Sequence, residues 1–251
     1  MRYFIEISYL GTGYHGWQIQ PNAITIQEVL ENCMSKILNS KIKLIGAGRT
    51  DSGVHANQMF AHFDFNSKII NSNELIYKLN SFLPKKIVIN DLIMVKNDAH
   101  ARFDAISRSY EYHITNKKNP FQINKIYFFK NSLDLKKMNL CSDILLDYND
   151  FKCFSKSKSD VKTYNCNILY AKWEIINEVF VFKIKADRFL RNMVRAIVGT
   201  LIEVGLDKIS LEEFESIVKK RDRKLAGYSV PAHALFLKKI EYNWVEILKN
   251  G

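Results

Sequence analysis

The order of two apolar periodicities along the chain constrains its fold more than any other feature. Strand-like apolar patterns in the first half cover four stretches: 2–10, 41–47, 56–65 and 86–95. Apolar residues three and four positions apart predict a helix at 26–38, behind the start signal Thr25-Ile-Gln-Glu28, and another at 72–83, stopped by Pro84. The order β-α-β-β-α-β predicts a ferredoxin-like unit with an antiparallel sheet.

The second half repeats this logic with insertions. Strands are predicted at 107–115, 167–176, 179–185 and, as one or two strands, 234–247. Helices are predicted at 134–146 and 187–204, and a short helix follows the capping sequence Ser210-Leu-Glu-Glu213. The prediction is therefore an α+β fold of two ferredoxin-like (β-α-β-β-α-β) halves with antiparallel sheets. The expected N-terminal domain covers residues 1–105 and the C-terminal domain residues 106–251.

Composition limits the partners and the compartment. The chain of 251 residues has 37 Lys and Arg against 26 Asp and Glu, a net charge of +11, which favours a polyanion such as nucleic acid or anionic membrane. An AT-rich genome with many Lys and Asn codons is the alternative explanation. No apolar run reaches the ~20 residues that cross a bilayer. Four cysteines without a CxxC pair, and histidines without ligand spacing, predict a reduced cytoplasmic protein with no metal site.

The sequence Gly11-Thr-Gly13-Tyr-His-Gly16 matches the GxGxxG pattern of dinucleotide-binding proteins and follows a predicted strand. That fingerprint has to open a long helix, whereas here Pro21 follows Gly16 within a few residues and the predicted helix begins later. We therefore expect a flexible loop or hairpin, and no nucleotide cofactor.

The segment Gly46-Ala-Gly-Arg-Thr-Asp-Ser-Gly-Val-His55 places Asp51 between glycines in a loop after a strand. An aspartic peptidase is one interpretation of Asp-Ser-Gly, but its chemistry needs two carboxylates and the other half has no second motif. Arg49 also suits an anionic partner better than a shared-proton pair. An Asx-turn that only holds the loop is the structural alternative.

Basic and aromatic residues mark the second half. On the predicted helix from Asp187, the arginines at 188, 191 and 195 would share one face, which favours phosphate contacts over a merely solvated face. Tyr110 and Tyr112 alternate along a predicted strand. Such tyrosines usually pack on a sheet, and they stack on bases only where that face lines a cleft.

Four motifs in this order resemble the TruA family of tRNA pseudouridine synthases almost end to end. They are Tyr9-Leu-Gly-Thr-Gly-Tyr-His-Gly-Trp-Gln18, Gly48-Arg-Thr-Asp-Ser-Gly-Val-His-Ala56, His100-Ala-Arg-Phe-Asp-Ala105 with Ser107-Arg-Ser-Tyr-Glu-Tyr112, and Asn192-Met-Val-Arg-Ala-Ile-Val-Gly199. The pattern departs from the family at Ser52, where Ala is common, and at Ala234, where Gly is expected; the second change puts the local backbone near 234 in question.

The resemblance implies roles for single residues. Asp51 is similar to the catalytic aspartate, Tyr110 to the tyrosine that packs on the uracil ring, and Arg195 to the arginine that pairs with the catalytic carboxylate. Arg49 is similar to the residue beside the flipped nucleotide. The family also implies an active-site cleft between the two halves, a homodimer without cofactors, and tRNA as substrate, modified at positions 38–40 on the 3′ side of the anticodon stem-loop.

The chemistry accounts for these residue types. Conversion of uridine to pseudouridine breaks the N1–C1′ bond and rejoins the uracil through C5, so no group enters or leaves overall and neither metal nor nucleotide cofactor is required. An ionised carboxylate serves as a nucleophile on sugar or base, or as a base at C2′. The uridine has to leave its stack, at roughly a few kcal/mol, and an aromatic ring offers it a new stacking surface.

Two rival functions remain at the level of sequence. One is a non-catalytic RNA-binding protein with a ferredoxin-like sheet, against which the glycine-framed Asp51 and the lack of an RNP-type aromatic motif both argue. The other is a synthase that modifies a different RNA position. Replacement of Asp51 distinguishes the first rival, and mapping of the modified sites distinguishes the second.

Overall fold

The computed structural model describes residues 1–157 and 161–249. Its contacts divide the chain into two compact units, Met1–Ile106 with the C-terminal segment from Leu237, and Ser107–Phe236. The first unit therefore takes up the end of the chain, which the sequence had assigned to the domain 106–251.

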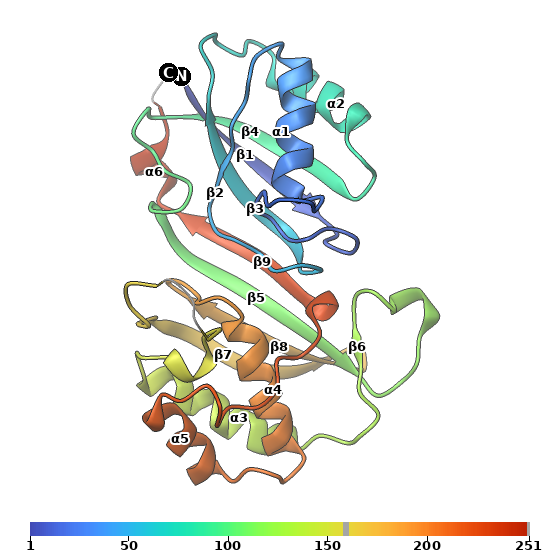
Figure 1. Ribbon diagram of the computed structural model, residues 1–251, viewed down its shortest axis with the longest axis vertical. Helices are drawn as coiled ribbons and strands as arrows, with labels where there is room; N and C mark the ends of the chain where they lie inside the picture. Colours follow the sequence, from blue (N-terminus) through green and yellow to red (C-terminus); the bar gives the residue numbers. More distant parts are fainter. Residues whose placement is uncertain (158–160, 250–251) are drawn as a thin grey trace. The chain divides into compact units, whose positions relative to one another are not determined.

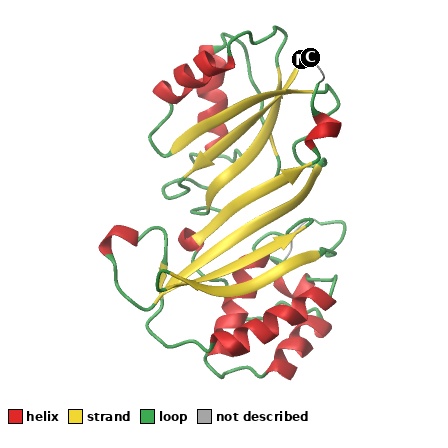
Figure 2. Cartoon of the chain, turned by 180° about the vertical axis from the view of Figure 1, so that it is seen from behind, coloured by secondary structure: helices red, strands yellow, loops and turns green. Residues whose placement is uncertain are grey.

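The first unit follows the predicted order of elements (Figure 1). These are β1 (Arg2–Tyr9), α1 (Ile26–Ile37), β2 (Ile45–Gly46), β3 (His55–Asp64), α2 (Ser72–Phe82), β4 (Ile87–Val95), most of β9 (Leu235–Tyr242) and α6 (Trp244–Ile247). Its strands lie in the order β4-β1-β3-β9, with β1 antiparallel to both neighbours and the short β2 antiparallel to β3. Helices α1 and α2 lie on the same face of this sheet in both views (Figures 1 and 2).

Apolar packing on both faces of the sheet explains why the C-terminal segment belongs to this unit. On the helix side, α1 buries Ile26, Leu30 and Met34 completely. On the other side, Phe4 and Phe60 meet Tyr242 and Trp244 in edge-on ring contacts with centroids 5.2–6.3 Å apart. The segment predicted as one or two strands at 234–247 thus ends in a helix that covers the sheet.

The second unit contains β5 (Ala105–Thr115, from Ser107 on), β6 (Tyr127–Phe128), α3 (Leu135–Ile144), β7 (Ile168–Ile176), β8 (Val179–Ala186), α4 (Met193–Gly205) and α5 (Leu211–Lys220). Strand β8 pairs antiparallel with both β5 and β7. The β7–β8 hairpin turns at Asn177 and Glu178, whose φ angles of 49° and 65° are those of a tight two-residue turn. Both units confirm the predicted α+β class with antiparallel sheets.

Two predicted elements were wrong in extent because side chains bind the backbone there. The helix expected from 187 begins only at Met193: the Asp187 carboxylate accepts the N–H groups of Asn167 (2.8 Å) and Arg188 (2.6 Å), and Asn192 is left-handed at φ 68°. The arginines at 188 and 191 therefore precede the helix and share no helix face with Arg195. The strand expected at 41–47 is reduced to β2, since the N–H groups of residues 42 and 44 bind side chains of α1.

None of the helices in the described ranges has both the length and the apolar character needed to span a bilayer.

A buried histidine makes the stability of the first unit depend on pH. The ring of His62 is 2% exposed, its Nδ1 accepts the N–H of Ala101 at 3.1 Å, and the ring of His100 lies 4.6 Å away. Burial, together with the charges of Arg2 and His100, lowers the pKa of His62 to about 4, whereas Asp64 and Asp104 act weakly in the opposite direction. The folded protein thus keeps this ring neutral over a pH range in which the unfolded chain protonates it.

We expect the free energy of unfolding to fall as the pH drops from about 6.5 towards 4, because the unfolded state binds the extra proton; His62 alone contributes at most about 3 kcal/mol. His62→Asn keeps an acceptor for the Ala101 N–H but removes the titration. Urea unfolding midpoints between pH 4.5 and 7.5 should therefore change less steeply in the variant than in the wild type. Equal slopes would show that other groups carry the acid sensitivity.

Candidate active site

Asp51 lies in the loop between β2 and β3, on the first unit, and its side chain is half-buried. Within the loop, the Val54 N–H donates to the Asp51 carbonyl at 3.1 Å, and from outside it the Trp17 N–H donates to the Thr50 carbonyl at 3.1 Å. Its conformation therefore depends on the second loop, residues 10–20, that contributes Trp17. We call residues 47–54 the aspartate loop.

The glycines of residues 10–20 allow that loop to lie directly against the aspartate loop. The Tyr14 carbonyl accepts the Gly53 N–H at 3.3 Å and the Ser52 hydroxyl at 3.1 Å. Gly16 has φ +87°, and a Cβ on it would lie 2.5 Å from the Thr50 carbonyl oxygen. The GxGxxG sequence therefore serves a close approach of two backbones, and the predicted loop is confirmed because α1 begins only at Ile26.

Buried side chains support the aspartate loop, and one of them, Trp17, belongs to the cluster Tyr14, His15, Trp17 and Gln18 that we expected to contact a substrate backbone. The hydroxyls of Tyr9 and Thr50 form a buried hydrogen bond of 2.8 Å, immediately beside Asp51 in sequence. His55 is buried and its Nδ1 accepts the Gly11 N–H at 2.9 Å. The Trp17 indole is buried where a Cβ on Gly46 would approach it within 2.5 Å. The motif contained His55 and Trp17, but nothing in their spacing indicated these partners.

Arg49 lies on the same loop as Asp51, and the two differ in exposure: Arg49 is exposed whereas Asp51 is half-buried. The buried Thr50 between them anchors the loop. The structure thus presents an exposed cation and a half-buried carboxylate from one short segment, an arrangement suited to an anionic substrate.

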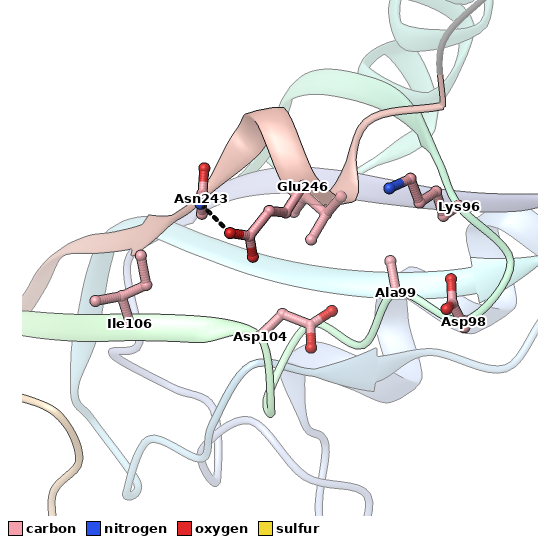
Figure 3. A pocket seen from close by; sticks show the side chains of 8 residues that line it. Lys96, Asp98, Ala99, Asp104, Ile106, Asn243 and Glu246 are labelled. Carbon is pink, nitrogen blue, oxygen red and sulfur yellow. Dashed lines mark hydrogen bonds between the residues drawn. The ribbon is translucent and has the colours of Figure 1, made fainter.

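The first unit also contains a pocket that is lined by none of the predicted site residues (Figure 3). Its charged lining residues are Lys96, Asp98, Asp104 and Glu246, and the Asn243 side chain donates to the Glu246 carboxylate at 2.6 Å. In the described residues no group of three or more His, Cys, Asp or Glu side chains is placed to hold a metal ion.

Tyr110 lies on β5 in the second unit, half-buried and opposite Ile184 of β8. Its ring meets the ring of Phe189 edge-on, with centroids 5.1 Å apart and an interplanar angle of 88°. Tyr112, two residues on, is buried and donates its hydroxyl to the Pro231 carbonyl at 2.9 Å. Tyr112 is therefore a packing residue, as the sequence allowed, and Tyr110 is the more accessible of the two.

Arg195 lies in the first turn of α4, half-buried, and its side chain is oriented by the chain that passes beside the helix. Its Nε donates to the Val230 carbonyl at 2.7 Å, and the Val230 N–H returns a bond of 3.2 Å to the Arg195 carbonyl. Burial raises the pKa of the Tyr112 phenol, and the positive charge of Arg195 acts on it in the opposite direction. The bond to the Val230 carbonyl thus gives the guanidinium a defined orientation within the second unit.

Close packing fixes residues 227–230 beside α4. A Cβ on Gly199 would lie 1.7 Å from the Tyr228 carbonyl oxygen, and the Gly227 N–H donates to the Thr200 hydroxyl at 2.9 Å. Ala234 is buried at the end of a short 3-10 helix and has no positive φ, so that position does not need glycine. The departure from the family pattern is therefore accommodated.

The model of the tRNA pseudouridine synthase family matches residues 6–104 and 148–243. The chain belongs to the tRNA pseudouridine synthase family. It is thus an enzyme of the pseudouridine synthase class, an isomerase of uridine. The matched residues include Arg49, Asp51 and Arg195, and Tyr110 lies between the two matched stretches.

Full-length relatives support this membership. A protein named tRNA pseudouridine synthase A from Azobacteroides pseudotrichonymphae genomovar. CFP2 is 49% identical over 245 residues, which cover 97% of this chain and 98% of that protein. The proteins of the same name from Bacteroides fragilis and Thermoanaerobacter sp. (strain X514) are 50% and 42% identical over 242 and 241 residues. The alignment with the Bacteroides fragilis protein covers 96% of each chain. The alignment with the Thermoanaerobacter protein covers 95% of this chain and 98% of that protein. This pseudouridine synthase thus matches its relatives over nearly their whole length.

Proposed function

We propose that this chain converts uridine to pseudouridine at tRNA positions 38–40, on the 3′ side of the anticodon stem-loop, with Asp51 as the catalytic carboxylate. The observation that carries the proposal is the support of the aspartate loop around Asp51. Residues 10–20 lie against this loop, where glycines permit the close approach, and the buried Tyr9–Thr50 bond anchors it. A loop that only connected two strands would not need this support. Preorganisation of this kind is characteristic of a group that acts on a reacting atom.

The reaction assigns tasks to the other residues. The N1–C1′ bond breaks, the C5–C1′ bond forms, C5 gives up its proton and N1 gains one, so atoms balance without a further reactant. Asp51 acts as nucleophile on sugar or base, or as base at C2′. A base inside a duplex is out of reach, and its extrusion costs roughly a few kcal/mol.

We further assign Tyr110 to the face of the extruded uracil, Arg195 to the carboxylate of Asp51 and Arg49 to the space that the nucleotide leaves. The exposure of Arg49 and the half-buried ring of Tyr110 support these roles, since both groups have to meet RNA. The bond from Arg195 Nε to Val230 supports a positioning of charge that a freely solvated phosphate contact would not require.

We also propose a homodimer in the cytoplasm, as the resemblance implies. The four cysteines are free thiols, three of them buried, which agrees with a reducing compartment. Sedimentation equilibrium tests the dimer against the chain mass of 29.3 kDa.

A transcript labelled with tritium at C5 of uridine tests the activity, because each conversion releases one tritium to water. Transcripts in which the uridines at 38, 39 and 40 are replaced by cytidine one at a time test the position. We expect release from a tRNA that carries these uridines and none from one that lacks all three. Release that persists without them would assign the enzyme to another RNA position, and no release from any tRNA would favour a non-catalytic RNA-binding protein.

A further inference from the structure

The segment that joins β5 to β6 and continues past it stands out from the rest of the second unit in both views (Figures 1 and 2). We call residues 116–130 the arm. The chain leaves β5 at Thr115 and returns as β6, which pairs in parallel with the end of β5. The arm lies between the two stretches that the family model matches, 6–104 and 148–243. None of the residues assigned to the reaction lies on it.

The charge of the arm has one sign. It carries four exposed lysines and no acidic residue: Lys117, Lys118, Lys125 and Lys130. Lys117 pairs with Glu178 of the β7–β8 turn, and Lys118, Lys125 and Lys130 add three further exposed positive charges to the arm. Such a segment attracts a polyanion and repels other basic surfaces.

Large apolar side chains lie among these lysines. Phe121 is 91% exposed and Ile123 is 65% exposed. The ammonium of Lys118 lies 5.6 Å from the ring centroid of Phe128, which is a cation–π contact. Basic and aromatic side chains on one projecting segment are the combination with which proteins bind single-stranded nucleic acid.

Hydrogen bonds within the arm fix the conformation of its turn. The Asn119 side chain accepts the Phe121 N–H at 3.0 Å, and the Gln122 carbonyl accepts the N–H groups of Lys125 and Ile126 at 3.0 and 3.1 Å. Ile126 is buried and anchors the return of the chain. The turn therefore presents Phe121 outward before any partner arrives, which reduces the entropy lost on binding.

We infer that the arm is a second contact for the tRNA substrate: its lysines bind phosphates and Phe121 stacks on an unpaired base. The inference rests on the proposed function, because that function makes tRNA the polyanion that this protein binds. The charge argues for RNA, because exposed lysines with no acidic residue among them complement the phosphates of a nucleic-acid backbone.

Binding of an unmodified tRNA transcript tests the arm without depending on catalysis. Phe121→Ala should weaken the tRNA affinity about 10-fold, within the range of a lost stacking contact. Lys118→Gln with Lys125→Gln should reduce the slope of log K against log salt by about 1.5, because two phosphate contacts are lost. The single-turnover rate at saturating enzyme should change less than the affinity.

Matched variants serve as controls. Phe82→Ala removes a phenylalanine that is 75% exposed on α2, and Lys85→Gln with Lys136→Gln removes two other exposed lysines. These variants should keep the wild-type affinity, and equal losses in them would reduce the arm to a share of a diffuse charge. An unchanged affinity in the arm variants would overturn the inference. The same holds if they lose only self-association in sedimentation velocity, since the arm would then contact a second copy.

The two proposals fail in different ways. If the wild-type protein releases no tritium from tRNA while the arm variants still lose affinity, the proposed function fails and the arm stands. If the wild type is active and the arm variants bind and react normally, the arm fails and the proposed function stands.

Discussion

Replacement of Asp51 by Asn is expected to abolish pseudouridine formation while tRNA binding is largely retained. The amide has nearly the shape of the carboxylate, so the Tyr9–Thr50 bond remains, as do the bonds to residues 10–20 through backbone groups and the Ser52 hydroxyl. It cannot act as nucleophile or base, and a rate loss of at least about 10³-fold follows. Tritium release and the dissociation constant for tRNA, measured on the same preparation, separate the two effects.

Asp98→Asn is a suitable control for this variant, because it removes an exposed carboxylate from the separate pocket of the same unit (Figure 3). It should behave as the wild type in both assays. Activity within a few fold of wild type in Asp51→Asn would contradict the mechanism. Loss of thermal stability would mean instead that the carboxylate holds the loop, as an Asx-turn does.

Replacement of Arg195 by Ala is expected to lower the rate more than the affinity. The bond to the Val230 carbonyl orients the guanidinium inside the second unit. A positioned charge that stabilises the catalytic carboxylate or the transition state is worth about 10²- to 10³-fold in rate. A phosphate contact would instead change the dissociation constant and its salt dependence. Single-turnover rates at saturating enzyme, together with tRNA binding at two salt concentrations, distinguish these outcomes.

Two further variants sharpen this comparison. Arg195→Lys keeps the charge but not the planar geometry, so it should recover part of the rate. Arg191→Ala removes an exposed arginine from the segment before α4, and it should reduce affinity at most. Equal losses of rate and affinity in Arg195→Ala would make Arg195 a simple phosphate contact.

The strands and helices that follow a single periodicity were predictable from the sequence. Strand β1 and helices α1 and α2 lie within a residue or two of their predicted bounds because apolar spacing fixes which face is buried. The start of α4 was not predictable from spacing, since the apolar pattern continues to 187 while Asp187 and Asn192 hold the backbone out of the helix. A side chain that binds the backbone leaves no trace in periodicity.

The candidate site, like the fold, was predictable from the sequence only in part. The glycines around Asp51 indicated a constrained loop, and both Gly16 and Gly53 have left-handed φ angles. The Tyr9–Thr50 bond and the contact of Arg195 with Val230 join residues 41 and 35 positions apart, and nothing local in the sequence indicates such partners. The roles of Asp51, Tyr110, Arg49 and Arg195 came from the motif resemblance rather than from spacing.

Pseudouridine mapping of tRNA from a strain that lacks this gene tests the central claim most directly. The account predicts that pseudouridine disappears at positions 38–40, that a plasmid copy of the wild-type gene restores it, and that an Asp51→Asn copy expressed to the same level does not. Pseudouridine that remains at these positions without the gene, or that returns with the Asp51→Asn copy, would contradict the account.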